Sequence, residues 1–228
     1  MKKVLITGGT KGIGLETAKK FVANNFEVIV CSSSAKNVDE NNKLFPEINF
    51  FQCDMSDKKS VNDFADTILE KFGSIDILIN NVGKFIQGRI SDEADGIFEE
   101  LMFTNLFGTY YLTRKILPKM IEKKEGTIFN IGSTASIKAY PDSGSYCISK
   151  HALIGLSKAL REEMKEHNIK VISILPGATL TASWDGVELP ENRLMPAQDI
   201  AQSIFDIYNL SPITVVEEII LRPMLGDL

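Results

Sequence analysis

The chain has 228 residues, 44% of them hydrophobic, and no stretch rich in proline, glycine and serine divides it, so we expect one domain spanning residues 1–228. Its formal net charge of −5 comes from interspersed acidic and basic residues, a pattern that argues against nucleic acid as a partner. No apolar run is long enough for a secretion signal or a membrane span, which favours a cytoplasmic protein with no membrane partner.

The apolar run 3–6 predicts a strand, and a glycine-rich loop separates it from a helical pattern over 15–23. Glycines permit positive φ and let the backbone approach a pyrophosphate, while the start of a helix offers unpaired N–H groups. The spacing is Gly-x-x-x-Gly-x-Gly rather than the more familiar Gly-x-Gly-x-x-Gly. We predict a dinucleotide-phosphate site in this loop, formed by Gly8, Thr10, Lys11, Gly12, Ile13 and Gly14.

Further apolar runs alternate with helical patterns to the end of the chain. The predicted strands cover 28–31, 48–51, 75–79, 127–131, 171–175 and 215–221. This alternation predicts an α/β fold, a Rossmann-like doubly wound parallel sheet of about seven strands with helices on both faces. Ligands of such folds bind beyond the carboxyl ends of the strands, so we expect the site there.

Three side chains suggest proton transfer to or from a carbonyl or alcohol oxygen. Ser133 follows strand 127–131, and Tyr146 and Lys150 lie four residues apart in a helical pattern, where they share one face. A nearby ammonium lowers the pKa of a phenol from about 10 towards neutral pH, where it becomes an acid-base catalyst. Tyr111 and Lys115 have the same spacing but no serine at a preceding strand end, and we interpret them as ordinary helix residues.

The sequence offers no metal-binding pattern. The three cysteines, Cys31, Cys53 and Cys147, have no paired ligand spacing, and the only histidines are His151 and His167. We expect reduced thiols and no metal site.

With these motifs in order, the chain resembles the short-chain dehydrogenase/reductase family over nearly its whole length. The glycine loop is joined by Asn80-Asn81-Val82-Gly83, which is similar to the family's Asn-Asn-Ala-Gly turn, and by Ser133, Tyr146 and Lys150. The resemblance implies that Asn105 completes the catalytic set of Asn105, Ser133, Tyr146 and Lys150. It also implies further cofactor contacts at Asp54, Met55, Asn80, Gly83, Tyr146, Lys150, Pro176, Gly177 and Thr179.

The choice between NADP and NAD depends on the residues after strand 28–31. No Asp or Glu stands there to bind a ribose 2′-hydroxyl, and Ser32 and Ser33 offer hydroxyl donors instead. Lys11 in the glycine loop is similar to the loop cation of many NADP-using relatives, although such relatives often carry an Arg where this chain has Ser32 and Ser33. We predict NADP (NADPH) rather than NAD.

The resemblance implies a mechanism for reducing a carbonyl with NADPH. Tyr146 donates a proton to the oxygen, Ser133 donates a hydrogen bond to it, and Lys150 lowers the Tyr146 pKa and passes a proton through a water held by Asn105. The substrate is predicted to be a small carbonyl or alcohol compound with apolar flanks, 3-oxoacyl groups being one option. Segment 179–198 is either a lid over that substrate or packing against the domain or a neighbouring subunit.

Other functions remain open. A sugar-nucleotide epimerase uses the same Tyr and Lys, but it usually needs a sizeable substrate domain, and only 51 residues follow Gly177. A dinucleotide-sensing or scaffold protein would bind the cofactor without turnover, and the intact catalytic set argues against it. The family resemblance also implies a homodimer or homotetramer, with the helices that carry Tyr111 and Tyr146 at the interface.

Overall fold

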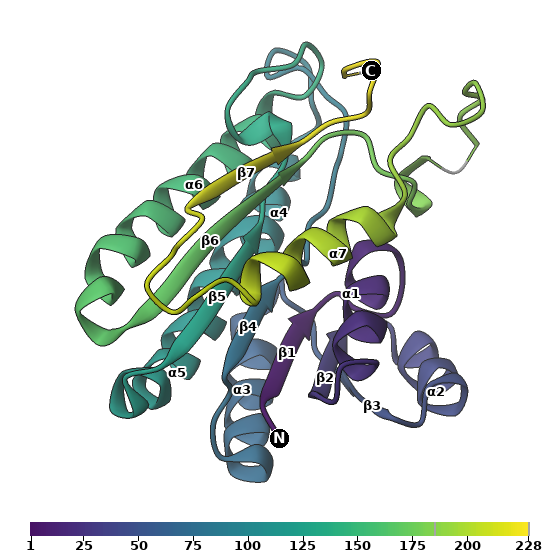
Figure 1. Ribbon diagram of the computed structural model, residues 1–228. Coiled ribbons are helices and arrows are strands. Elements are labelled where there is room, and N and C mark those ends of the chain that lie inside the picture. The colour runs from purple at the N-terminus through teal and green to yellow at the C-terminus, as the bar shows by residue number, and fades with distance from the viewer. Residues whose placement is uncertain (185, 228) are drawn as a thin grey trace.

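In the computed structural model, which describes residues 1–184 and 186–227, seven strands form one parallel sheet in the order β3-β2-β1-β4-β5-β6-β7 (Figure 1). The predicted doubly wound fold is confirmed. The strands are β1 Lys3–Thr7, β2 Glu27–Ser32, β3 Ile48–Gln52, β4 Ile77–Asn80, β5 Gly126–Ile131, β6 Ile169–Pro176 and β7 Glu218–Leu221.

Helices cover both faces of the sheet (Figure 1). They are α1 Gly12–Val22, α2 Ala35–Leu44, α3 Lys58–Phe72, α4 Ile97–Met102, α5 Gly108–Lys123, α6 Gly144–Met164 and α7 Ala197–Tyr208. A π-helix, Phe103–Phe107, joins α4 to α5, and short 3-10 helices span Thr134–Ser136, Lys165–His167 and Ala182–Trp184.

Side chains alternate along each strand, so the two faces build two separate cores. On one face, Leu5 and Leu78 belong to a cluster with residues of α3, α5 and α6, such as Ile68 and Leu112. On the other face, Ile6 and Ile79 pack with residues of α1 and α7. The strands are therefore apolar on both sides, as expected for a parallel sheet covered by two helical layers.

Two predicted strands are shorter in the structure. The run 75–79 begins pairing only at Ile77, and the run 215–221 pairs only from Glu218. The carboxyl ends of β1, β4, β5 and β6 lie at the same edge, because the sheet is parallel, and the loops that follow them form the candidate site.

Candidate active site

The glycine loop after β1 has the geometry of a phosphate cradle. Gly8 and Gly12 have φ of 68° and 56°, values that favour glycine. A Cβ at Gly14 would lie 2.5 Å from the Gly8 carbonyl oxygen, so only glycine lets α1 begin this close to the loop. Lys11 at the N-cap makes no side-chain cap, which leaves the first N–H groups of α1 available to an anion.

A cavity of about 650 Å³ extends from this loop over the ends of β2 and β3. At its far end, the Thr10 hydroxyl lies 3.3 Å from that of Ser32, and Ser34 caps α2 by accepting from the Asn37 N–H. The predicted cofactor residues that line the cavity are Gly8, Thr10, Lys11, Gly12, Ile13, Ser32, Ser33, Asp54, Met55 and Gly83.

A second cavity, of about 500 Å³, lies over the ends of β5 and β6. The two cavities share wall residues, among them Asn81, Gly83 and Phe85, so they form one continuous groove. Eight predicted residues line the second cavity, namely Ile13, Gly83, Ser133, Tyr146, Lys150, Pro176, Gly177 and Thr179. We call it the catalytic pocket.

Ser133 and Tyr146 both line the catalytic pocket, and the Ser133 hydroxyl lies near enough to the phenol to act on its pKa. Ser133 is fixed because its hydroxyl accepts from the Ala135 N–H at 3.1 Å and its own N–H donates to Ser136. The ring of Phe85 packs edge-on against Tyr146, with centroids 5.0 Å apart. Serine and tyrosine hydroxyls are therefore held side by side, as a single carbonyl oxygen would require.

Lys150 lies beneath this pair and is buried in α6. Its ammonium donates to the Ile131 carbonyl at 3.1 Å and lies 5.9 Å from the centre of the Tyr146 ring. A Cβ at Gly83 would come within 2.9 Å of Nζ, so glycine makes room for the ammonium. Burial lowers the pKa of Lys150 to about 8.

The predicted effect of Lys150 on Tyr146 is wrong for this structure. Burial raises the pKa of Tyr146, the hydrogen bond from Ser133 opposes that rise, and a nearby Cys147 adds to it. The lysine is itself desolvated and turned to a backbone carbonyl, so its charge does not outweigh the burial of the phenol.

Asn105 is buried in the π-helix and holds the loop after β4. Its Oδ1 accepts from the Lys84 N–H at 2.7 Å, and its Nδ2 donates to the Lys84 carbonyl at 3.0 Å and to Ser149. It does not line either cavity. Oδ1 and the Lys150 ammonium both approach the position that a Gly83 Cβ would take, at 3.8 and 2.9 Å, so Asn105 lies near Lys150.

The side chains of the adjacent residues Asn80 and Asn81 lie in different places. Asn80 still belongs to β4, and its buried side chain donates to Thr113 and Asn130 rather than reaching either cavity. Asn81 lines both cavities and donates to the Thr7 and Gly8 carbonyls at 3.0 Å each. The side chain that braces the glycine loop is thus the neighbour of the predicted one.

Segment 179–198 contributes to the catalytic pocket through Thr179, Thr181, Trp184 and Val187, whereas Leu180 is 63% exposed. Tyr140 and Asp227 also line it. Sequence reasoning missed Asp227, because the tail after β7 shows no motif. Within residues 1–184 and 186–227, no three His, Cys, Asp or Glu side chains gather as a metal site. Among the same residues, no helix is long and apolar enough to cross a bilayer.

Comparison with known proteins defines the class. The short chain dehydrogenase family matches residues 2–192. A sepiapterin reductase of Chlorobaculum tepidum is 36% identical, over 99% of this chain and 97% of its own length. The mouse dehydrogenase/reductase SDR family member 7B is 34% identical, over 89% of this chain and 69% of its own. This chain therefore belongs to the short-chain dehydrogenase/reductase family and is an oxidoreductase.

Solved structures agree with this fold. ElxO with NADP bound has a TM-score of 0.88 and 30% identity, covering 97% of this chain and 96% of its own. A variant of actinorhodin polyketide ketoreductase with NADPH has a TM-score of 0.90 at 24% identity, covering 100% of this chain and 98% of its own, and supports the fold alone.

Proposed function

We propose that the protein reduces the carbonyl group of a small substrate with NADPH, which supplies the hydride when bound. The proposal rests on one observation. The catalytic pocket is lined by Ser133, Tyr146 and Lys150 and is continuous with the cavity at the glycine loop. Ser133 donates a hydrogen bond to the substrate oxygen and Tyr146 donates its proton. The raised pKa of Tyr146 keeps the phenol protonated at neutral pH, as a proton donor must be.

The protonation states of Tyr146 and Lys150 favour the reductive direction. Lys150, with a pKa of about 8, exchanges its proton readily near neutral pH and lies next to Tyr146, so it can return a proton to the phenolate after each turnover. Asn105 keeps the Lys84 backbone in place behind it. Its proposed role is therefore to position the loop between the two cavities, and the family resemblance adds that it holds the relay water.

NADP is the proposed cofactor because no acidic side chain stands at the end of β2. Ser32, Ser33 and Ser34 line the cavity there, together with Lys11. A carboxylate at this place would bind a ribose 2′-hydroxyl and repel a 2′-phosphate. Hydroxyls and an ammonium instead donate hydrogen bonds to the phosphate oxygens. The relative ElxO was solved with NADP, which agrees with this proposal.

The substrate proposal stays at the level of a small ketone or aldehyde. The relative from Chlorobaculum tepidum is named a sepiapterin reductase, and one solved neighbour is described as a candidate betaketoacyl-ACP reductase, so both chemistries belong in a first panel. The pocket walls combine Phe85, Trp184 and Val187 with polar groups. These apolar side chains favour a substrate with a ring or alkyl flank.

Assembly into a homodimer or homotetramer is part of the proposal. Aromatic and aliphatic side chains are exposed on neighbouring helices, with Phe98 on α4, Tyr110 on α5 and Ile148 on α6 each 40 to 42% exposed. Such a face is the kind that subunits bury. Sedimentation would show a mass of two or four chains, and a monomeric mass would contradict it.

The test is NADPH consumption with a panel of ketones, aldehydes, sepiapterin and 3-oxoacyl thioesters. Tyr146→Phe is expected to lose about 10²- to 10⁴-fold in kcat, because it removes the general acid. Tyr111→Phe is the matched control, since Tyr111 has the same spacing to a lysine but packs under Lys58, outside both cavities. Equal losses in both variants, or NADPH binding by the wild type without any turnover, would contradict a reductase.

A further inference from the structure

The outer wall of the catalytic pocket is a segment without a helix or strand of its own. Residues 84–96 lie between β4 and α4, and Lys84 and Phe85 line the pocket. The Phe85 ring packs edge-on against Tyr146, with centroids 5.0 Å apart. Within this described segment, a bridge at Gly88 is the only ladder contact. Contacts with neighbouring elements must therefore fix the place of this wall.

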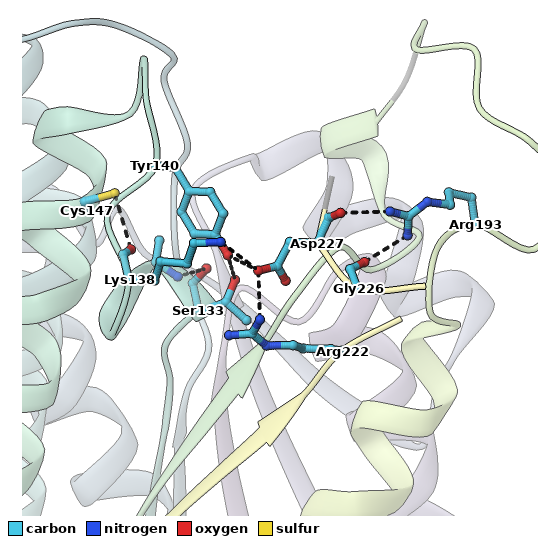
Figure 2. Close-up of polar contacts among 10 residues, drawn as sticks. Ser133, Lys138, Tyr140, Cys147, Arg193, Arg222, Gly226 and Asp227 are labelled. Carbon is cyan, nitrogen blue, oxygen red and sulfur yellow. Dashed lines mark hydrogen bonds and ion pairs between the residues drawn. The ribbon is translucent and has the colours of Figure 1, made fainter. Parts of the chain in front are cut away.

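The opposite wall of the pocket, at the tail after β7, is held by several contacts (Figure 2). Asp227 accepts from the Tyr140 hydroxyl at 2.5 Å and from Arg222 at 2.9 Å. Arg193 donates to the carbonyls of Gly226 and Asp227 at 3.0 and 2.8 Å. Loss of one such contact leaves the others, so the position of this wall does not depend on a single side chain.

The two ends of segment 84–96 are anchored differently. Near its inner end, Asn105 holds the Lys84 backbone through two hydrogen bonds of 2.7 and 3.0 Å. Further along, the Gly88 N–H donates to the Asp142 carbonyl at 2.8 Å, and the Gly88 carbonyl accepts from the Gly144 N–H at 3.2 Å. The pocket-lining residues therefore lie between an anchor in the π-helix and an anchor at the start of α6.

Two side chains reinforce the anchor at α6, and they differ in their exposure to water. Arg89 pairs with Asp142, but these side chains are 66% and 36% exposed, and exposed ion pairs contribute little. Glu93 accepts from the hydroxyl of Ser145, which is buried and directly precedes Tyr146. A charge-assisted hydrogen bond to a buried hydroxyl is the stronger kind of contact. Glu93 is therefore the side chain that ties this segment to the start of α6.

We propose that Glu93 is a positioning residue, which ties segment 84–96 to Ser145 and so holds Phe85 as a preformed wall for the substrate. The proposal rests on the proposed function and deepens it. Glu93 lines neither cavity, so it acts through the segment rather than by touching the substrate. Without this bond, the segment must be ordered each time a substrate binds. That cost falls on substrate and transition state alike, which raises KM and leaves kcat unchanged.

Proton transfer does not depend on the contact of Glu93. Ser133 is fixed by hydrogen bonds with Ala135 and Ser136, and Tyr146 belongs to α6. A rise in KM without a fall in kcat therefore distinguishes a positioning role from a general loss of structure.

The test measures NADPH consumption with acetophenone, whose ring would lie against Phe85, and hydrogen exchange of the peptide that covers residues 84–96. Glu93→Ala is expected to raise KM about tenfold, to keep kcat within about twofold, and to speed exchange in this peptide alone. Glu93→Gln keeps an oxygen that accepts from Ser145, so it should recover most of the lost affinity. Ser145→Ala should raise KM as Glu93→Ala does, and the double variant should raise it no further, because both changes remove the same bond.

Glu99→Ala is the matched control, because Glu99 carries the same charge and is exposed in the first turn of α4. It should leave KM, kcat and hydrogen exchange unchanged. An equal rise of KM in Glu99→Ala would overturn the proposal, as would a fall in kcat at constant KM in Glu93→Ala or additive effects in the double variant.

Hydrogen exchange needs no turnover, so it separates failure of this proposal from failure of the reductase function. Unchanged exchange in Glu93→Ala, or exchange that quickens throughout the chain, would refute the anchoring role of Glu93. A wild type that reduces other carbonyls of the panel but not acetophenone would refute the wall at Phe85. Absent NADPH consumption with every carbonyl of the panel would instead refute the reductase.

Discussion

At the scale of single residues, the burial of Lys150 predicts a pH-dependent stability. Its pKa of about 8 in the folded protein lies below the ordinary 10.5, so between these values the unfolded chain binds the proton and the folded one does not. The cost of burying the ammonium is fully present below pH 8 and is relieved as pH rises to about 10.5. Lys150→Met removes this cost, so its advantage in free energy of unfolding over the wild type should shrink by on the order of 3 kcal/mol from pH 7 to pH 11.

Urea unfolding of both proteins across this range measures the difference. Lys119→Met is a suitable control, because Lys119 is exposed beside Glu122 and its charge is solvated in both states. Wild type and Lys150→Met curves that run parallel in pH would contradict the lowered pKa.

Residue identities in the site were predictable from the sequence, and residue environments were not. The positions of Ser133, Tyr146 and Lys150 follow from motif spacing, and the structure gathers them in one pocket. Which of the two adjacent asparagines turns its side chain to the groove depends on where β4 ends, because a shift of one residue at a strand end turns a side chain to the other face. The predicted direction of the Tyr146 pKa shift was wrong, because the spacing of two residues on a helix does not show how deeply the phenol is buried.

At the scale of elements, two glycines at different places in helices predict opposite effects of the same change. Gly155 lies in the interior of α6, and a Cβ there meets nothing within 4 Å. Gly155→Ala should stabilise the protein by about 1 kcal/mol, because alanine favours helix by that amount. Gly108 begins α5, where a Cβ would stand 2.1 Å from the Met55 carbonyl oxygen, so Gly108→Ala should destabilise by about 1–3 kcal/mol.

Thermal unfolding separates these outcomes, since 1 kcal/mol corresponds to a shift of about 2–4 °C in a chain of this size. Destabilisation by Gly155→Ala would mean that a neighbouring chain packs on that face of α6. An unchanged Tm in Gly108→Ala would mean that α5 can move away from the Met55 carbonyl without a cost in stability.

The elements themselves were largely predictable, since apolar runs between helical patterns define the strands of a covered parallel sheet. Their junctions were not. The π-helix at Phe103–Phe107 has the composition of an ordinary helix, so the sequence does not show its wider turn. The tail around Asp227 has neither a periodic pattern nor a motif, so its return to the pocket depends on contacts with Arg193 and Tyr140 that no local sequence feature specifies.

At the scale of the whole molecule, the shift in Tm on adding each dinucleotide should show which one the protein binds. A ligand at 100 times its Kd stabilises the folded state by about 2.7 kcal/mol, which is about 5–10 °C in Tm for this length. We expect NADPH to produce such a shift and NADH, at the same concentration, a much smaller one. Ser32 ends β2, and its hydroxyl lies 3.3 Å from that of Thr10. Substitutions at Ser32 therefore test what causes the preference for NADPH.

Ser32→Asp should reverse the order of the two cofactors. The new carboxylate would accept from the ribose 2′-hydroxyl of NADH and repel the 2′-phosphate of NADPH, so the NADH shift in Tm should grow while the NADPH shift falls. Ser32→Ala, which removes the hydroxyl without adding charge, should keep the preference for NADPH, although with a smaller shift. Equal shifts with both cofactors in the wild type would contradict the NADP proposal. An unchanged order in Ser32→Asp would place the 2′-phosphate elsewhere in the cavity, with Lys11 as its principal partner.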